Sequence, residues 1–408
     1  MAGEGPLRLA HCRTWDTVSP ILPEFIQSHV ARFLEIGRIS NLASRRRGVF
    51  LAELAKLLSG PQWLVLSRMS VGERVVAWHY GFQFHGTWFW YQPTFDSSVE
   101  KYWPGFCLLT QVIQEATEDT SLITLDLGLG SEAYKAKFAN ESRETVYIEL
   151  HRFVLHQLGA IFRYRMATAV KSLPAAERFL DSARNAFYEL RCRLHDQGSK
   201  RTQMWAGRQL LRMFWARDEV LFCEWDNLEP VFADSLDVEL RSLEIGQLAV
   251  AAMAYEDDQG TLNYLIRSAQ RLRAGGGEGF VLAGNDGRPV HFAWVAPFNG
   301  FYSQELNTTL KASLDSVIMF DCWTPPAVRG RGYGKQGLKL ISGRMKAGGK
   351  RLWAFAAAEN PAWRRAIEKS NFKHRFSLTR KRMVFIDLNK DSVFSVDPKD
   401  QAVSATEL

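Results

Sequence analysis

The chain has 408 residues, which is more than one ordinary domain usually holds and favours two domains. Apolar residues make up 46% and charged residues 23%, a globular composition, and no run of eighteen apolar residues predicts a membrane span. The formal charge of +7 suits an anionic ligand, but it would equally suit nucleic acid or an ordinary soluble surface. Charge therefore excludes little.

The cysteines and the first residues indicate a cytoplasmic protein. The five cysteines are scattered and form no Cys-x-x-Cys pair, which argues against a disulfide framework or a zinc site. The nine histidines show no metal-ligand spacing, so we expect no metal. The sequence from Met1 to Pro6 lacks the basic and hydrophobic regions of a secretory signal.

Residues 1–22 are predicted to be a lead-in, and apolar spacing predicts two helices between residues 23 and 59. Clusters of aromatic and β-branched residues, together with the turn residues between them, then predict an alternation of strands and helices. The strands are expected at 63–68, 75–84, 88–91, 122–127 and 145–153, and the helices at 104–118 and 132–138.

Residues 159–215 have a helical pattern and are predicted to link the first half of the chain to a second half that begins near Val220. In the second half, helices are expected at 245–255 and 260–273, and strands at 238–241, 280–283, 289–296, 314–323 and 383–388. A polar tail from residue 391 is expected to be disordered. The two halves therefore read as a divergent internal repeat.

One stretch, residues 317–372, carries most of the chemical information. An apolar strand ends at Thr324 and is followed by the turn Val328-Arg329-Gly330-Arg331-Gly332-Tyr333-Gly334, a helix, a strand from Arg351, and a second helix after Asn360. A glycine-rich turn that opens a helix presents bare N–H groups together with the positive end of the helix dipole. The two arginines add positive charge, so this turn is predicted to bind phosphate.

The spacing Arg329-x-x-Gly332-x-Gly334 after a strand resembles the acyl-CoA pyrophosphate loop of the GNAT N-acyltransferases. The stretch from Glu359 to Phe372, in which an asparagine opens a helix that ends in Glu368-Lys369, resembles that family's second motif. The resemblance implies that acetyl-CoA is the acyl donor. It also implies that Thr324, the turn Val328–Gly334 and Asn360 contact it.

Residues 50–153 resemble the CelD-like acetyltransferase domain of cellulose biosynthesis, a relative of GNAT. The residues that carry this resemblance are Pro104-Gly105 and the run Asp126-Leu-Gly-Leu-Gly-Ser-Glu-Ala-Tyr-Lys135. This half lacks the Arg-x-x-Gly-x-Gly pattern. The expected fold is α/β with a mixed α+β sheet: two tandem GNAT-like domains at 1–157 and 220–390, joined by helical linkers at 158–219.

Gly128-x-Gly130-x-x-Ala133 also fits a dinucleotide fingerprint or the glycine loop of S-adenosylmethionine-dependent methyltransferases. Three strands and a helix precede it, and the regular strand–helix alternation that those folds need afterwards is missing. We therefore expect neither ligand there.

The resemblance implies direct attack of a small-molecule amine, possibly an amino sugar, on the thioester. Asp321, beside Phe320 on an apolar strand, is the candidate base, and the alternative is that its carboxylate pairs with a nearby arginine. Family members often place a tyrosine before Glu-Lys as the general acid, but this chain has Ile367 there. Two rivals remain: a FemAB-type transferase that uses aminoacyl-tRNA, and a non-catalytic scaffold. We expect no nucleic-acid partner, and the oligomeric state stays open.

Overall fold

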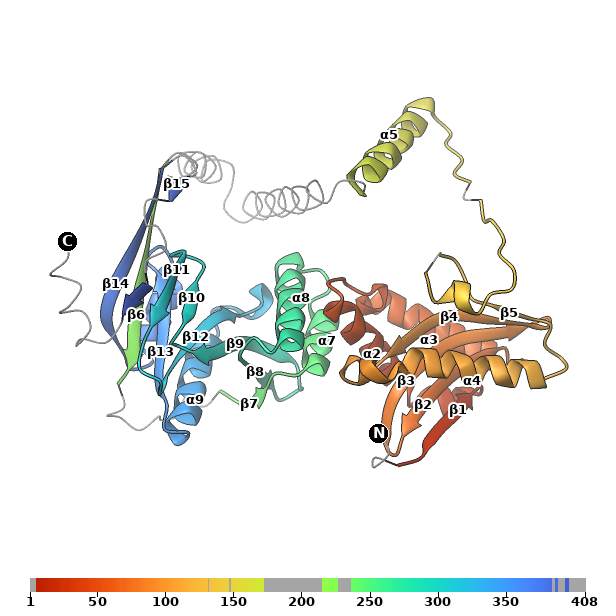
Figure 1. Ribbon diagram of the computed structural model, residues 1–408, viewed down its shortest axis with the longest axis horizontal. Coiled ribbons are helices and arrows are strands. Elements are labelled where there is room, and N and C mark those ends of the chain that lie inside the picture. The colour runs from red at the N-terminus through yellow and green to blue at the C-terminus, as the bar shows by residue number, and fades with distance from the viewer. Residues whose placement is uncertain are drawn as a thin grey trace. The chain divides into compact units, whose positions relative to one another are not determined.

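The computed structural model describes residues 5–130, 132–146, 148–171, 215–226, 236–383, 386–387 and 393–395 (Figure 1). The chain divides into two compact units. The first comprises Met1–Phe138, Asp218–Thr379 and Asp391–Leu408, and the second comprises Ala139–Arg217 and Arg380–Lys390. Among the described residues, no helix is long and apolar enough to cross a membrane.

A five-stranded sheet in the order β1-β2-β3-β4-β5 forms the N-terminal half of the first unit. Its strands are β1 Leu7–Cys12, β2 Leu64–Val71, β3 Arg74–Phe84, β4 Thr87–Phe95 and β5 Thr124–Asp126. The helices of this half are α1 Trp15–Val18, α2 Leu22–Glu35, α3 Arg45–Ser59 and α4 Pro104–Glu118. Short 3-10 turns are η1 Asn41–Ala43, η2 Ser97–Tyr102 and η3 Lys135–Lys137.

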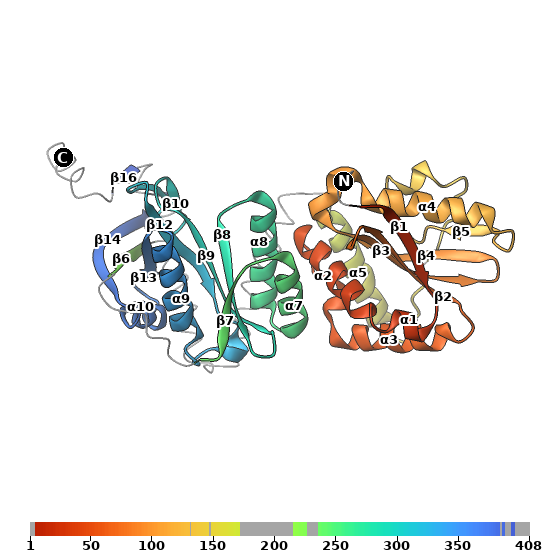
Figure 2. The same cartoon turned by 90° about the horizontal axis from the view of Figure 1, so that it is seen from below.

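Alternation along the strands places helices on both faces of this sheet (Figure 2). Leu64 and Leu66 join the apolar core that includes α2 and α3, whereas Val65 between them joins the core under α4. Because both faces are covered, β2 reads as a nearly continuous apolar run rather than as a half-polar strand.

The C-terminal half of the first unit is built on an eight-stranded mixed sheet in the order β15-β14-β6-β13-β12-β9-β8-β7. The strands are β6 Trp215–Trp225, β7 Val238–Ser242, β8 Glu278–Gly284, β9 Pro289–Pro297, β12 Ser316–Trp323, β13 Arg351–Ala357, β14 Phe372–Met383 and β15 Ile386–Asp387. A small sheet holds β10 Phe301–Ser303, β11 Thr308–Lys311 and β16 Val393–Ser395.

Helices again cover both faces of the large sheet. They are α7 Ile245–Ala254, α8 Gln259–Ala274, α9 Tyr333–Ala347 and α10 Pro361–Glu368. Phe292 faces the core that includes α7 and α8, and its neighbour Ala293 faces the core beneath α9. The core of α7 and α8 is continuous with that of α2, and Gln27 Nε2 donates to the Gly246 carbonyl at 3.1 Å. The two halves of the first unit therefore share one apolar core.

The mixed α/β fold with two sheet-rich halves is the predicted fold class, and it is confirmed. Several boundaries differ from the prediction. The lead-in contains strand β1, the strand expected at 383–388 holds β15, and β14, β6 and the small sheet were not predicted. Helix α5 Val154–Lys171 accounts for part of the predicted helical linker, and residues 172–214 lie outside the described residues.

Two predicted elements of the first half are wrong. The helix expected at 132–138 is only the 3-10 turn η3, because Gly128 and Gly130 adopt positive φ angles of 74° and 108° and direct the chain into a loop. The strand expected at 145–153 does not form in the part of this segment that the structure describes. Its alternating side chains Val146 and Ile148 are 76% and 75% exposed, so the alternation lacks the neighbouring strand that would bury it.

Two glycines of α9 give a matched test of how this helix packs. A Cβ on Gly337 would lie 2.6 Å from Cδ2 of the buried His291, whereas one on Gly343 meets nothing within 4 Å. We expect Gly337→Ala to lower the free energy of unfolding by about 1–3 kcal/mol through overpacking. Gly343→Ala should raise it by about 0.4–1 kcal/mol through chain entropy. Urea unfolding measures both, and equal changes would contradict this packing.

Candidate functional site

Two parallel strands part at the centre of the C-terminal half. Strands β12 and β13 pair from Ser316↔Arg351 to Met319↔Ala354, where the parallel pairing between described residues ends. Beyond that point β13 pairs with β6, while β12 continues along β9 with an irregularity between Phe320 and Trp323. The ends of the two strands therefore diverge, as the predicted acyl-CoA site requires.

Asp321 lies in this irregularity and has the left-handed φ of 46°. Its carboxylate accepts from Arg271 Nη1 at 2.6 Å, and its backbone carbonyl accepts from the Tyr264 hydroxyl at 3.0 Å. The arginine pairing that the sequence left open is thus present. Both side chains remain about one quarter exposed, so the pair lies at the edge of the core and not within it.

The Arg/Gly turn follows directly. A 3-10 turn, η4 Pro326–Val328, uses the N–H groups of Val328 and Arg329 to donate to Pro325 and Pro326. The N–H groups open to a ligand therefore begin at Gly330, later than the sequence implied. Val328 packs its buried side chain against Leu282 and Val290.

The turn then delivers the chain to α9. Gly330 and Gly332 have φ angles of 79° and 84°, and the N–H of Gln336 makes the bond back to the Gly332 carbonyl at 3.0 Å. The N–H groups of Tyr333 and Gly334 therefore point out of the helix end. The guanidinium of Arg329 is anchored, since its Nε donates to the Thr324 carbonyl at 2.9 Å and it lies over the Trp323 ring. Arg329, Arg331 and the two glycines are exposed, which suits an anion-binding end.

His291 is a site residue that sequence reasoning missed. It lies on β9, shares a 2.8 Å hydrogen bond between its Nδ1 and Thr324 Oγ1, and is almost fully buried beneath α9. Burial lowers its pKa to about 4, so the ring is neutral at physiological pH. Its neighbour Gly337 leaves the space that the ring occupies. The signal was available, because a lone histidine in the apolar strand sequence Pro-Val-His-Phe-Ala is unusual.

The second motif forms the expected helix, and its asparagine hydrogen-bonds to the start of that helix. The side-chain oxygen of Asn360 accepts from the Trp363 N–H at 3.1 Å and caps α10. Trp363 Nε1 donates to the Phe355 carbonyl at 3.0 Å and ties the helix to β13. Ile367, at the position of the family's tyrosine, is buried in the core beneath α9 and α10.

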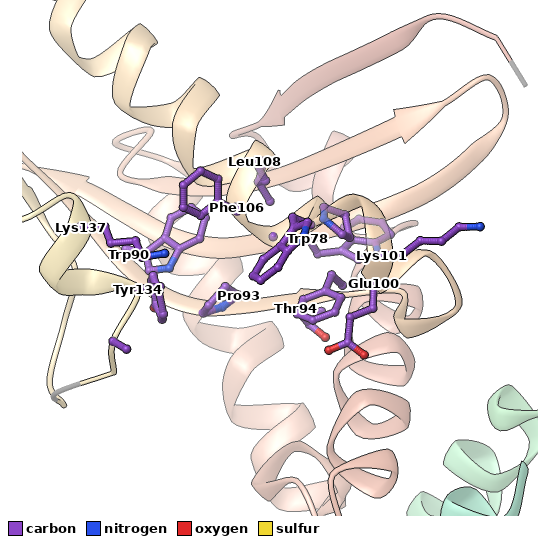
Figure 3. A pocket seen from close by; sticks show the side chains of 15 residues that line it. Trp78, Trp90, Pro93, Thr94, Glu100, Lys101, Phe106, Leu108, Tyr134 and Lys137 are labelled. Atoms are coloured by element: carbon purple, nitrogen blue, oxygen red, sulfur yellow. The ribbon is translucent and has the colours of Figure 1, made fainter. Parts of the chain in front are cut away.

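The N-terminal half contains an equivalent parting of strands with a cavity in it. Parallel β4 and β5 pair only from Thr87↔Thr124 to Phe89↔Asp126. The cavity beside the rest of β4 has a volume of about 630 Å³ and is walled largely by aromatic and aliphatic side chains (Figure 3). The lining residues are Trp78, Trp90, Pro93, Thr94, Phe95, Glu100, Lys101, Trp103, Pro104, Gly105, Phe106, Leu108, Ala133, Tyr134 and Lys137.

The glycine run after β5 forms one wall of this cavity. Asp126 Oδ1 accepts from the Gly128 N–H at 2.7 Å, and Lys135 Nζ donates to the Leu129 carbonyl at 2.5 Å. The loop therefore closes on itself, is followed directly by the short 3-10 turn η3, and directs Tyr134 to the cavity. This geometry lacks the helix N-terminus that a dinucleotide fingerprint needs.

Comparison with known proteins assigns the N-terminal half. A family model described as an acetyltransferase (GNAT) domain matches residues 1–136. No curated protein sequence matches the chain. Residues 1–136 therefore match a GNAT acetyltransferase domain, which confirms that part of the prediction for the N-terminal half. The match ends before the C-terminal half, where the Arg/Gly turn lies.

Similar solved structures are distant. A GNAT-family protein from Novosphingobium aromaticivorans is 17% identical over 40% of this chain, with a TM-score of 0.29, and the chain spans 63% of its length. A GNAT-family acetyltransferase from Colwellia psychrerythraea is 9% identical, covering 92% of this chain and 99% of its own, with a TM-score of 0.30. A phosphinothricin acetyltransferase from Sinorhizobium meliloti, solved with AcCoA, is 17% identical over 38% of this chain and 91% of its own, with a TM-score of 0.27. None of these assigns a substrate here.

Within the part of the chain that the structure describes, no group of three or more His, Cys, Asp or Glu side chains is placed to hold a metal ion.

Three buried histidines predict how stability depends on pH. Burial lowers the pKa of His29 and His291 to about 4 and that of His79 to about 3. An unfolded histidine titrates near 6.5, so between pH 6.5 and 4 the unfolded chain binds protons that the folded chain does not. As the pH is lowered from 6.5 to 4, the free energy of unfolding should therefore decrease by up to about 1.4 kcal/mol per pH unit for each histidine.

His79→Phe isolates one of these contributions. The new ring can keep the 4.1 Å stacking on Trp90 but cannot take up a proton. Urea unfolding at pH 7.5, 6 and 5 should show a shallower decline than in the parent protein. Parallel declines would mean that His79 is protonated in the folded state.

Proposed function

We propose that the chain is an acyl-CoA-dependent N-acyltransferase that uses acetyl-CoA and acts on a small-molecule amine, with the donor held in the C-terminal half. The observation that carries this is the coincidence of three features: strands β12 and β13 part, the Arg/Gly turn follows at once, and the open end of α9 faces outward. Phosphate oxygens would meet the N–H groups of Gly330 to Gly334, and Arg329 and Arg331 would supply positive charge.

The same site offers groups for acyl transfer. The bound donor would supply a thioester whose carbonyl carbon the amine attacks. Thr324 is held by His291 at the end of β12, and the strand beyond Met319 has backbone groups that no longer pair with β13. These groups are the candidates for orienting the donor and for stabilising charge on its carbonyl oxygen. We also propose, on the Pro104-Gly105 and Tyr134-Lys135 motifs, that the N-terminal half is of the CelD-like type.

Asp321 remains our proposed proton acceptor. It lies where β12 begins to leave β13, and its carboxylate is partly exposed. The bond to Arg271 fixes the position of the carboxylate. Because the same bond fits a purely structural carboxylate, the two roles are separated by experiment below.

Two exposed glycines at opposite ends of α9 test the donor site. Gly330 and Gly349 both have positive φ, 79° and 68°, and an added Cβ meets nothing within 4 Å at either. We expect Gly330→Trp to abolish acetyl-CoA binding measured by calorimetry, because the side chain blocks the N–H groups of the turn. Gly349→Trp carries the same backbone strain and should bind normally. Normal binding by Gly330→Trp would place the donor elsewhere, with the cavity of the N-terminal half as the next candidate.

In the same titration, Arg329→Met should weaken acetyl-CoA binding by about 1.5–3 kcal/mol, the value of a charge-assisted hydrogen bond.

The Asp321–Arg271 pair tests the chemistry. Asp321→Asn keeps the shape, and asparagine tolerates the left-handed backbone. If Asp321 is the base, the rate of thiol release should fall about 10²–10⁴-fold while acetyl-CoA affinity holds. Arg271→Met should then leave most of the rate. If the pair is structural, both variants should lose a similar free energy of unfolding. The rate of thiol release should then fall only as far as the loss of folded protein explains.

The acceptor class distinguishes the competing functions. We propose an amino sugar of polysaccharide biosynthesis on the CelD-like resemblance, with aminoacyl-tRNA and a scaffold role as alternatives. Thiol release should be screened across amino sugars, amino acids and polyamines. Turnover with an amino sugar supports the proposal, whereas acetyl-CoA binding without turnover by any amine would favour the scaffold role. Absence of acetyl-CoA binding would favour the aminoacyl transferase.

A further inference from the structure

The cavity of the N-terminal half has walls that suit an apolar ligand. Trp78 and Trp90 come from strands β3 and β4, and Trp103 and Phe106 from the start of α4, as Figure 3 shows for those it labels. A volume of about 630 Å³ lies within the range that holds a small molecule. Large aromatic walls with few polar groups favour burial of hydrocarbon over hydrogen-bonding ligands.

The loop beside the cavity is unsuited to phosphate. It carries Asp96 and Glu100 where the other half carries two arginines, and α4 begins at Pro104, which has no N–H. The Ser98 N–H donates to Asp96 Oδ1 at 2.9 Å and the Trp103 N–H donates to the Glu100 carbonyl at 2.9 Å. Two carboxylates and two occupied N–H groups therefore stand where the other half has two arginines and a glycine turn.

The charges that line the cavity nevertheless favour an anionic group at its edge. Glu100 is paired with Arg273 at 2.6 Å and with Arg32 at 3.3 Å, so its charge is balanced. Lys137 is exposed at one side of the cavity and forms no ion pair with any residue that the structure describes, whereas the Lys101 side chain extends away from the cavity on the other side (Figure 3). A single carboxylate can meet a lysine as a point charge without the cradle of N–H groups that a pyrophosphate needs.

We propose that this cavity binds the alkyl chain of an amphiphile that has a carboxylate head group, with the chain against the aromatic walls and the head near Lys137. The proposal does not rest on the transferase site, because it concerns binding to the other half and needs no acyl donor. Each methylene that leaves water for an apolar wall contributes about 0.8 kcal/mol, which is about fourfold in affinity.

Calorimetry with the full chain and the sodium salts of hexanoate, octanoate, decanoate and dodecanoate, all below their micelle concentrations, tests this. Affinity should rise about fourfold per methylene until the cavity is full. The affinity of dodecanoylglycine, which carries the same chain in amide linkage, is then compared with that of dodecanoate. The tighter of the two shows whether the cavity prefers a free fatty acid or an acylated small molecule. Flat affinity across the series would overturn the proposal, and so would tighter binding of N-acetylglucosamine than of dodecanoate.

Two matched variants locate the ligand. Ala133 and Ala136 are both exposed on the loop after β5, but only Ala133 lines the cavity. Ala133→Trp should abolish dodecanoate binding, and Ala136→Trp should leave it unchanged. Equal loss in both variants would place the ligand elsewhere.

Charge reversal tests the head group without touching the core. The variant Lys137→Glu should weaken dodecanoate binding at least fivefold and strengthen binding of dodecylamine. Lys56→Glu, an exposed change on α3, should do neither. If dodecanoate affinity is unchanged in Lys137→Glu, the carboxylate part of the proposal is wrong.

Discussion

The loss of pairing between two parallel strands is the constraint on which the rest of the C-terminal half depends. A strand that leaves its neighbour inside a protein exposes backbone groups that must find other partners. Here side chains from distant segments supply them: the Tyr264 hydroxyl donates to the Asp321 carbonyl, and Arg329 Nε donates to the Thr324 carbonyl. Trp323 Nε1 adds a further tie by donating to Thr261 Oγ1. The diverging end is thus braced by α8 on one side and by the turn on the other.

The two halves share a parting of parallel strands but differ in the residues that follow it. In the C-terminal half an exposed Arg/Gly turn opens α9, whereas in the N-terminal half an acidic loop and a proline open α4. The family match covers the half without the Arg/Gly turn. A fold shared by both halves therefore does not imply one shared ligand, and the side chains at each helix start decide what each can bind.

The sequence was informative where the signal is local. Glycine spacing, the arginines and the flanking apolar runs predicted the turn and the start of α9, because these features depend on residues close in the chain. The sequence could not show which arginine pairs with Asp321, since Arg271 lies fifty positions away and only the folded structure brings the two together. Strand β14 was missed because lysines and arginines dominate its composition, although Phe376 and Leu378 face the core at alternate positions. The strand expected at 145–153 failed for the opposite reason, since its alternation has no neighbour to pair with in the described structure.

His291 links these observations to the charge of the site. Its ring contacts Thr324 at the end of β12 and occupies the space left by Gly337 in α9, so it joins the strand that parts to the helix that follows the turn. A charged imidazolium there would add to the positive charge of Arg329 and Arg331, and its burial beneath the helix would cost desolvation free energy. Because burial holds its pKa near 4, the ring stays neutral and the positive charge at the turn comes from Arg329 and Arg331. Under the proposed function, these two guanidinium groups supply the attraction for a phosphate, while the hydrogen bond with His291 fixes the Thr324 side chain at the end of β12.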